Sequence, residues 1–300
     1  MYVIAGATGN TGKVIAELLL AKGQKVRVIS RSADKLQPFV NQGAEAFVGS
    51  LDDSVAMTRA FSGATAVYVM IPPDITAKDF RATQDRTSDA LAAAIAGANV
   101  SHAVSLSSVG ADKSEKTGPV VGLHQFEEKL NRIANLNVLH LRAGYFMENL
   151  LPQMGVIHSM GMMAGPLKGD LQVAMIATRD IGAAAAAALQ ARDFTGKQTR
   201  ELLGQRDVTM NEAAAIIGKA IAKPGLSYSK VPDMMLKPAL KQLGMSSSMV
   251  DLLLEMAGAL NSGYMTPLEN RSAANTTPTS IENFVADIFV PAFRGNAAGA

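Results

Sequence analysis

Residues 1–12 read MYVIAGATGNTG, and this stretch decides the fold. The apolar run Tyr2–Ala5 meets three glycines spaced as Gly6-x-x-Gly9-x-x-Gly12, and the next ten residues carry apolar side chains at helical spacing. This order predicts a strand, a tight glycine turn and a helix. Such a turn lets the backbone approach a pyrophosphate, and the free N–H groups at the helix start favour its negative charge. The stretch therefore predicts a dinucleotide site.

The composition of the 300 residues limits the class of protein. Hydrophobic residues make up 48% of the chain, so we expect a large core in one large or two modest domains. The net charge of +2 is too small to indicate nucleic acid or a membrane surface as partner, and no run of Lys/Arg forms a basic stripe. The absence of cysteine excludes disulfides, thiolate metal sites and a cysteine nucleophile, and it is compatible with a reducing cytoplasm.

No segment predicts a targeting signal or a membrane span. The first strand begins at residue 2, which leaves no room for a signal peptide in the chain as given. The longest run of small apolar residues, Ile181–Leu189, is far shorter than a span. The four histidines lack metal-ligand spacing, and there is no G-x-S-x-G motif. We therefore expect a soluble, cytoplasmic protein without a metal site or serine-hydrolase chemistry.

Strands and helices alternate through the first half of the chain. Helical segments separate six apolar runs, at residues 2–5, 25–30, 44–48, 66–71, 102–107 and 137–141. The alternation predicts an α/β fold with a doubly wound parallel sheet, a Rossmann domain. The apolar runs lack polar alternation, which indicates burial on both faces. We assign residues 1–150 to this dinucleotide-binding domain.

Residues 151–300 predict a smaller, α-rich substrate lobe. Within it, the segment near 178–205 combines an alanine-rich helix with a short strand, and we expect it to return to the Rossmann sheet. Thr178 or Asp180 would cap that helix. Thr279 and Glu282 form a Thr-x-x-Glu pattern, which predicts a capping box ahead of the last apolar helix.

Arg31 ends the second predicted strand, beside the expected position of the adenosine ribose. An acid at this position bonds the ribose 2′-hydroxyl, whereas an arginine accommodates a 2′-phosphate. Lys35 follows one turn later, and no acid precedes Asp34. The alternative is an ordinary solvated arginine at a strand end. The arginine beside the glycine turn predicts NADP(H) in preference to NAD(H).

Further residues fall along the edge of the sheet where the cofactor would lie. The side chains of Thr8, Asn10 and Thr11 either cap the helix or bind the pyrophosphate, and the cap is favoured for Asn10. Pro72, with Pro73, either shapes the wall near the cofactor or only ends the fourth strand. The Ser107 hydroxyl either orients a substrate carbonyl or cofactor ribose, or satisfies turn amides.

Two further sites are candidates for the chemistry. His124 and Glu128 share one helical face, and the near-neutral pKa of histidine suits a proton donor; a structural histidine is the alternative. Tyr145 and Phe146 follow the sixth strand, where they could hold the nicotinamide carboxamide and flank a substrate. Four methionines follow and either cover a flat apolar substrate or fill gaps in the lobe; they are Met154, Met160, Met162 and Met163.

Six stretches together carry a family resemblance: GATGNTG at 6–12, VRVISR at 26–31, HAVSLSSVG at 102–110, HQFEE at 124–128, LRAGYFMENL at 141–150 and TPTSIENFV at 277–285. Their combination resembles the NmrA-like family, a branch of the atypical short-chain dehydrogenase/reductases. The resemblance implies a Rossmann domain with a small C-terminal lobe, and NADP(H) as cofactor. It also implies the residues that would hold that cofactor: Gly6, Thr8, Gly9, Asn10, Thr11, Gly12, Arg31, Pro72, Ser107, Tyr145 and Phe146.

The chain departs from short-chain reductases at the catalytic helix. Those with full machinery carry Tyr-x-x-x-Lys, and the corresponding positions here are His124 and Glu128. Members that resemble this chain are NADPH-dependent quinone or dye reductases, whereas others bind NADP and act as redox-sensing regulators. We expect an NADP(H)-dependent oxidoreductase that passes hydride to a small, apolar, quinone-like acceptor. The alternative is a non-catalytic NADP(H) sensor of the NmrA type with a protein partner; the missing motif argues against an epimerase or carbonyl reductase.

Overall fold

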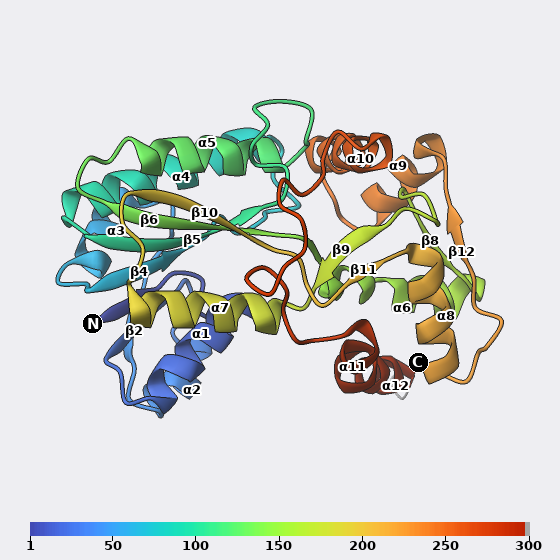
Figure 1. Ribbon diagram of the computed structural model, residues 1–300, viewed down its shortest axis with the longest axis horizontal. Coiled ribbons are helices and arrows are strands. Elements are labelled where there is room, and N and C mark those ends of the chain that lie inside the picture. The colour runs from blue at the N-terminus through green and yellow to red at the C-terminus, as the bar shows by residue number, and fades with distance from the viewer. Residues whose placement is uncertain (298–300) are drawn as a thin grey trace.

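The computed structural model describes residues 1–297 and has a seven-stranded parallel sheet in its larger part (Figure 1). The strand order is β10 (Lys197–Leu202), β6 (Asn137–Ala143), β5 (His102–Ser108), β4 (Ala66–Val69), β1 (Tyr2–Ile4), β2 (Val26–Ser30) and β3 (Glu45–Val48). Every paired neighbour in this sheet runs parallel. The predicted doubly wound α/β class is confirmed.

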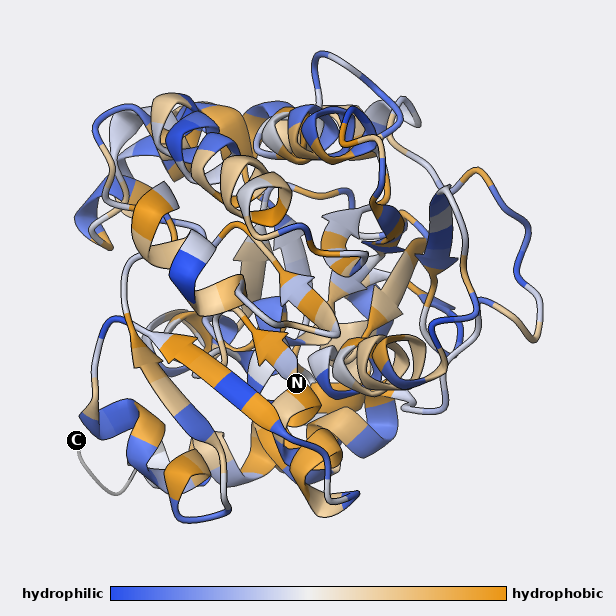
Figure 2. Ribbon diagram, turned by 90° about the vertical axis from the view of Figure 1, so that its left-hand side faces the viewer, coloured by the Kyte–Doolittle hydropathy of each residue, from blue (hydrophilic) through white to orange (hydrophobic). Residues whose placement is uncertain are grey.

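Helices cover both faces of the sheet. One face carries α1 (Asn10–Ala21), η1 (Asp34–Leu36), α2 (Gln37–Val40) and α7 (Thr178–Ala191); the other carries α3 (Ser54–Phe61), α4 (Phe80–Gly97) and α5 (Val120–Asn131) (Figure 1). Side chains of β1 alternate between the two faces, with Ile4 on the first and Val3 on the second. The helices show bands of hydrophobic and hydrophilic residues (Figure 2), and the sheet-facing Ile15 and Leu19 of α1 are fully buried.

A smaller lobe begins directly after β6. Its strands form two small sheets, β11 (Asp207–Val208), β9 (Val173–Ile176) and β7 (Tyr145–Phe146) in one, β12 (Tyr228–Lys230) and β8 (Met163–Gly165) in the other. Its helices are η2 (Met147–Leu150), α6 (Gln153–Met160), α8 (Met210–Ala220), α9 (Asp233–Gln242), α10 (Ser247–Ser262), α11 (Ile281–Phe284), the π-helical η3 (Val285–Phe289) and α12 (Val290–Ala297). Within residues 1–297, no helix has the length and hydropathy needed to cross a membrane.

The chain returns from the lobe to the large sheet. β10 pairs with β6 along its whole length, and α7 packs against α1. The segment 263–280, which we call the strap, then crosses back between the two parts of the molecule (Figure 1). Buried Glu201 of β10 accepts hydrogen bonds from the backbone N–H groups of Leu268 and Glu269 in the strap, at 3.0 and 2.9 Å. The large sheet and the strap are therefore joined by a buried carboxylate.

The predicted side-chain caps of α7 and α11 are wrong, because Asp180 and Thr279 bond each other instead. The buried Asp180 carboxylate accepts from the backbone N–H of Thr279 at 2.9 Å and from its hydroxyl at 2.7 Å. Ala177 is the N-cap of α7, without a side-chain bond, and the Thr178 hydroxyl donates to Glu148. α11 is capped by Ser280. A contact between residues 99 positions apart replaces both local caps.

A histidine is buried between β5, β6 and the end of α5. His140 is 1% exposed; its Nδ1 lies 2.6 Å from Ser105 Oγ and its Nε2 3.0 Å from Asn131 Oδ1. An amide oxygen only accepts, so Nε2 carries the proton and Nδ1 accepts from the serine hydroxyl. Burial is the main effect that lowers the pKa of His140 to about 4. The imidazole is therefore neutral in the folded protein.

This histidine predicts a loss of stability in mild acid. Its folded pKa lies below the ordinary 6.5, so between these values the unfolded chain binds a proton that the folded chain excludes. We expect the free energy of unfolding to fall by about 2 kcal/mol from pH 7 to pH 5 through this group. Urea unfolding at both pH values should show this fall in the wild type and in the exposed control His158→Gln, and a smaller fall in His140→Gln. Equal falls in all three proteins would contradict the assignment.

Candidate cofactor cradle and acceptor cavity

The predicted glycine turn joins β1 to α1, and the structure requires glycine at two of its positions. Gly6 has a φ of +67°, the left-handed region that favours glycine. A Cβ at Gly12 would lie 2.3 Å from the carbonyl oxygen of Gly6. The N–H of Gly9 donates to that same carbonyl at 2.9 Å. The start of α1 is therefore held directly against the carboxyl end of β1. We call this turn, residues 6–12, the cradle.

The first turn of α1 offers open backbone amides. Its N-cap is Gly9, which makes no side-chain cap bond, and its first turn holds no acidic residue. The first N–H groups of a helix have no acceptor within the helix, and the helix dipole places positive charge there. Thr8, Gly9 and Asn10 are exposed at this point. The predicted cap by Asn10 is wrong, because Asn10 is the first helical residue, and the open amides fit a pyrophosphate.

Thr11 points into the protein instead of toward this opening. Its Oγ1 lies 2.8 Å from the hydroxyl of Tyr68 on β4, and both residues are buried. Burial raises the pKa of the Tyr68 phenol, so it keeps its proton in this hydrogen bond. The Thr11 side chain therefore ties α1 to the sheet.

Arg31 and Pro72 lie at the same edge of the sheet. Arg31 follows β2 with an exposed side chain, and Pro72 is exposed in the loop that follows β4. In that loop, hydrogen bonds from Thr76 are the main cause of the lowered pKa of Asp74, and the positive charge of Arg31 adds to the effect. The guanidinium therefore stands close to the loop that follows β4.

The Ser107 hydroxyl belongs to a buried ionic network at the ends of β5 and β6. It donates to Glu127 Oε1 at 2.5 Å, while Arg142 donates to the same carboxylate through Nε at 3.0 Å and Nη2 at 2.6 Å. Glu127 is 4% exposed, and its carboxylate raises the pKa of Arg142 against the opposing effect of burial. Glu127 is a site residue that the sequence motifs did not predict. The available signal was a glutamate on the buried face of α5, beside Phe126 and Leu130.

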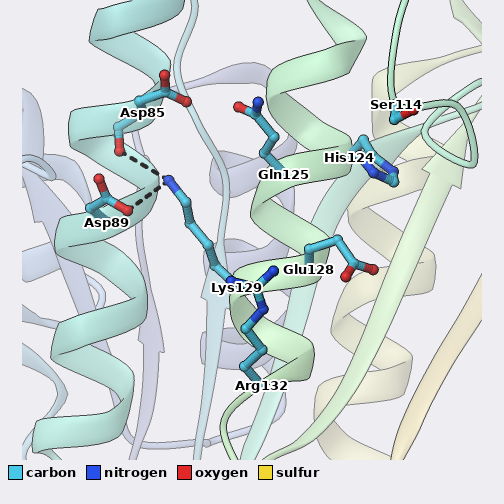
Figure 3. Close-up of a pocket in the computed structure, with 8 residues that line it drawn as sticks. All are labelled: Asp85, Asp89, Ser114, His124, Gln125, Glu128, Lys129 and Arg132. Atoms are coloured by element: carbon cyan, nitrogen blue, oxygen red, sulfur yellow. Dashed lines mark hydrogen bonds and ion pairs between the residues drawn. The ribbon is translucent and has the colours of Figure 1, made fainter.

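His124 lines a polar groove between α4 and α5 (Figure 3). Its Nδ1 lies 2.8 Å from the carbonyl oxygen of Ala111. Lys129 crosses the groove to Asp89 at 2.6 Å. The groove has a volume of about 670 Å³, and its lining is largely polar or charged: Asp85, Asp89, Ser114, His124, Gln125, Glu128, Lys129 and Arg132.

Tyr145 and Phe146 point to opposite sides of β7. Phe146 packs against the core cluster of the large sheet, whereas Tyr145 packs in the lobe. Gly144, between β6 and β7, allows a close approach, because a Cβ there would lie 2.4 Å from the Ala174 carbonyl oxygen. The tyrosine is therefore placed in the lobe, two residues beyond the end of β6.

The Tyr145 side chain lines an apolar cavity of about 100 Å³. The lining comes from β7, η2, α6, β8, α8, β12 and α10: Tyr145, Asn149, Leu150, Gln153, Met163, Gly165, Pro166, Leu167, Met210, Tyr228, Leu253, Met256, Ala257 and Leu260. No charged side chain is among them. Burial raises the pKa of Tyr145 to about 12. Of the four methionines singled out in the sequence, Met163 lines the cavity, whereas Met160 is 63% exposed.

The two candidates for chemistry thus lie in separate places. His124 faces a polar groove on the outer helices, whereas Tyr145 faces an apolar cavity in the lobe, and the two linings share no residue. Among residues 1–297, no cluster of three His, Asp or Glu side chains could hold a metal ion. The structure therefore offers open amides at the glycine turn and, separately in the lobe, a cavity with a mainly apolar lining.

Comparison with known proteins identifies the family of this chain. The model of the NmrA-like family matches residues 2–285, and the chain belongs to this family, as its motifs predict. It is 29% identical over 224 residues to the (4-alkanoyl-5-oxo-2,5-dihydrofuran-3-yl)methyl phosphate reductase of Streptomyces griseus subsp. griseus, covering 75% of each chain.

Solved structures are similar over nearly the whole fold. The NADPH-dependent quinone oxidoreductase QOR2 of Escherichia coli, in complex with NADPH, has a TM-score of 0.79 at 24% identity, covering 96% of this chain and 100% of that one. The triphenylmethane reductase of Citrobacter sp., in complex with NADP(H), has a TM-score of 0.80 at 18% identity with the same coverages. At these identities the likeness concerns the fold.

The cradle predicts a specific effect of one added methyl group. Gly12→Ala forces a Cβ against the Gly6 carbonyl, so we expect about 1–3 kcal/mol of lost stability and at least tenfold weaker NADP⁺ binding. The matched control is Gly155→Ala in α6, where a Cβ meets no atom within 4 Å. Thermal unfolding and calorimetric titration with NADP⁺ measure both effects. Wild-type affinity in Gly12→Ala would show that the close approach is not needed for binding.

Proposed function

We propose that this chain is an NADP(H)-dependent oxidoreductase that passes hydride to a small, neutral, apolar acceptor of the quinone type. The observation that carries the proposal is the apolar cavity at Tyr145, a residue that stands two positions beyond the carboxyl end of β6. In open α/β sheets, ligands bind at the carboxyl ends of the strands. The cofactor, when bound, supplies the hydride, and the protein supplies binding and orientation.

The cofactor would lie along the sheet edge from α1 to β7. The backbone amides of residue 8 and residues 10–12 would bind the pyrophosphate, where the strand order reverses between β1 and β4. Arg31 would bind the 2′-phosphate, and Pro72 would form part of the wall. The backbone of Tyr145 and Phe146 would hold the nicotinamide end. Ser107 would act through its bond to Glu127, by keeping the ends of β5 and β6 in place.

The lining of the cavity limits the acceptor. Burial of a charged group without a partner is costly, and no charged side chain lines this cavity. A phosphate group such as the one in the name of the Streptomyces reductase would find no cation there. Methionine side chains adapt to flat, irregular shapes, and Met163, Met210 and Met256 all contribute to the wall. A neutral ring system fits these surroundings best.

The role of Arg31 is tested by comparing two cofactors. Arg31→Ala removes a charge-assisted contact to the 2′-phosphate, so we expect NADPH to bind 10- to 100-fold more weakly and NADH less than threefold more weakly. The control Arg59→Ala removes an exposed arginine of α3 and should change neither Kd. Both dissociation constants can be measured by the fluorescence of the reduced nicotinamide. Equal losses for NADPH and NADH would refute the 2′-phosphate assignment.

The activity is tested by NADPH oxidation with a panel of benzoquinones and naphthoquinones. We expect turnover with at least one neutral quinone, and at least a tenfold lower kcat/KM in Leu253→Trp, where the larger side chain fills the cavity. The Kd for NADPH should stay within twofold of wild type, because Leu253 lies on α10 in the lobe. Tight NADP(H) binding without turnover on any acceptor, together with a co-purifying protein, would favour the sensor alternative.

A further inference from the structure

The cavity at Tyr145 contains four polar side chains, and two of them are fully engaged with the protein. The amide of Gln153 donates to the Ala164 carbonyl at 2.9 Å and accepts from the Ala164 N–H at 3.0 Å. The hydroxyl of Tyr228 donates to the Leu167 carbonyl at 3.0 Å. Tyr145 and Asn149 complete the polar set, and neither side chain makes a hydrogen bond within the part of the chain that the structure describes. These two groups are available to a ligand.

Tyr145 is the donor that stands inside the cavity. Asn149 is exposed at η2, whereas Tyr145 is half-buried and packs within the lobe core. The Tyr145 phenol lies close enough to Tyr228 that its charged form would raise the pKa of the Tyr228 phenol. Burial raises the pKa of Tyr145 itself to about 12, so its hydroxyl keeps its proton at neutral pH.

A donor in such a place favours a particular ligand. The Tyr145 hydroxyl has no acceptor within residues 1–297, so a ligand oxygen in the cavity can accept its hydrogen bond. The other atoms of the wall are mainly aliphatic and thioether groups, which attract an apolar ring. The cavity therefore combines one fixed donor with apolar walls.

We propose that the Tyr145 hydroxyl donates a hydrogen bond to a carbonyl oxygen of the bound acceptor, and so selects rings that carry a carbonyl. This inference rests on the proposed function and names the recognition group of the same site. Hydride transfer to a quinone brings two electrons, and negative charge gathers on the carbonyl oxygen until a proton from solvent completes the hydroquinone. The Tyr145 hydroxyl stabilises that oxygen without losing its own proton.

Tyr145→Phe tests the proposal because it keeps the ring and removes only the hydroxyl. The matched control is Tyr2→Phe, which removes a hydroxyl from β1, the strand that begins at the opposite end of the sheet. With menadione as acceptor, we expect kcat/KM to fall 5- to 20-fold in Tyr145→Phe and to stay within twofold in Tyr2→Phe. The Kd for NADPH should be unchanged in both. An unchanged kcat/KM for menadione in Tyr145→Phe would overturn the proposal.

Binding separates this proposal from the proposed function. Calorimetry of the NADP⁺-bound protein would compare menadione with 2-methylnaphthalene, which has the same rings and no oxygen. We expect Tyr145→Phe to weaken menadione binding 5- to 20-fold and to leave 2-methylnaphthalene binding within twofold. If these binding changes are found but the wild type shows no turnover, the proposed oxidoreductase function is refuted and the role of Tyr145 in binding is kept. Equal changes for both ligands, or no menadione binding by the wild type, would overturn the role of Tyr145.

Discussion

The close contact between Gly12 and the Gly6 carbonyl determines where α1 stands on the sheet, and the cradle depends on it. A second contact of this kind holds α1 from the other side, since a Cβ at Gly182 of α7 would lie 2.7 Å from Val14 Cβ. α1 is thus held between the turn after β1 and the helix that returns from the lobe. Because both contacts exclude side chains, the open amides of the first helical turn remain fixed where the strand order reverses.

Buried carboxylates fix the rest of the arrangement. Glu127 joins α5 to the ends of β5 and β6. Glu201 joins β10 to the strap, and Asp180 joins α7 to the end of the strap at Thr279. A buried charge is tolerated only when hydrogen bonds satisfy it, so each carboxylate defines the position of its partners. These links connect segments that are distant in sequence, and through them the lobe keeps its place beyond the carboxyl end of β6.

The separation of His124 from Tyr145 bears on which of the two sites suits hydride transfer to an apolar acceptor. A reductase whose cofactor carries the hydride needs a dry cavity and a fixed orientation more than it needs a full set of acid and base groups. The apolar lining with Tyr145 and Met163 meets that need, whereas the groove at His124 is open, charged and crossed by Lys129. A chain that lacks Tyr-x-x-x-Lys can therefore still hold a neutral acceptor close to the edge where a nicotinamide would lie.

The sequence by itself determined the parallel sheet, the glycine turn and the family, because strand–helix periodicity and glycine spacing are local properties of the chain. It also placed Arg31 and Tyr145 at the ends of strands. It failed where a side chain finds its partner far away: Thr279 and Asp180 bond each other, and Ser107 bonds Glu127. Only the tertiary structure decided that His124 and Tyr145 face different cavities. The reason is geometric, since the direction of each side chain depends on how its helix or strand is packed against elements from elsewhere in the chain.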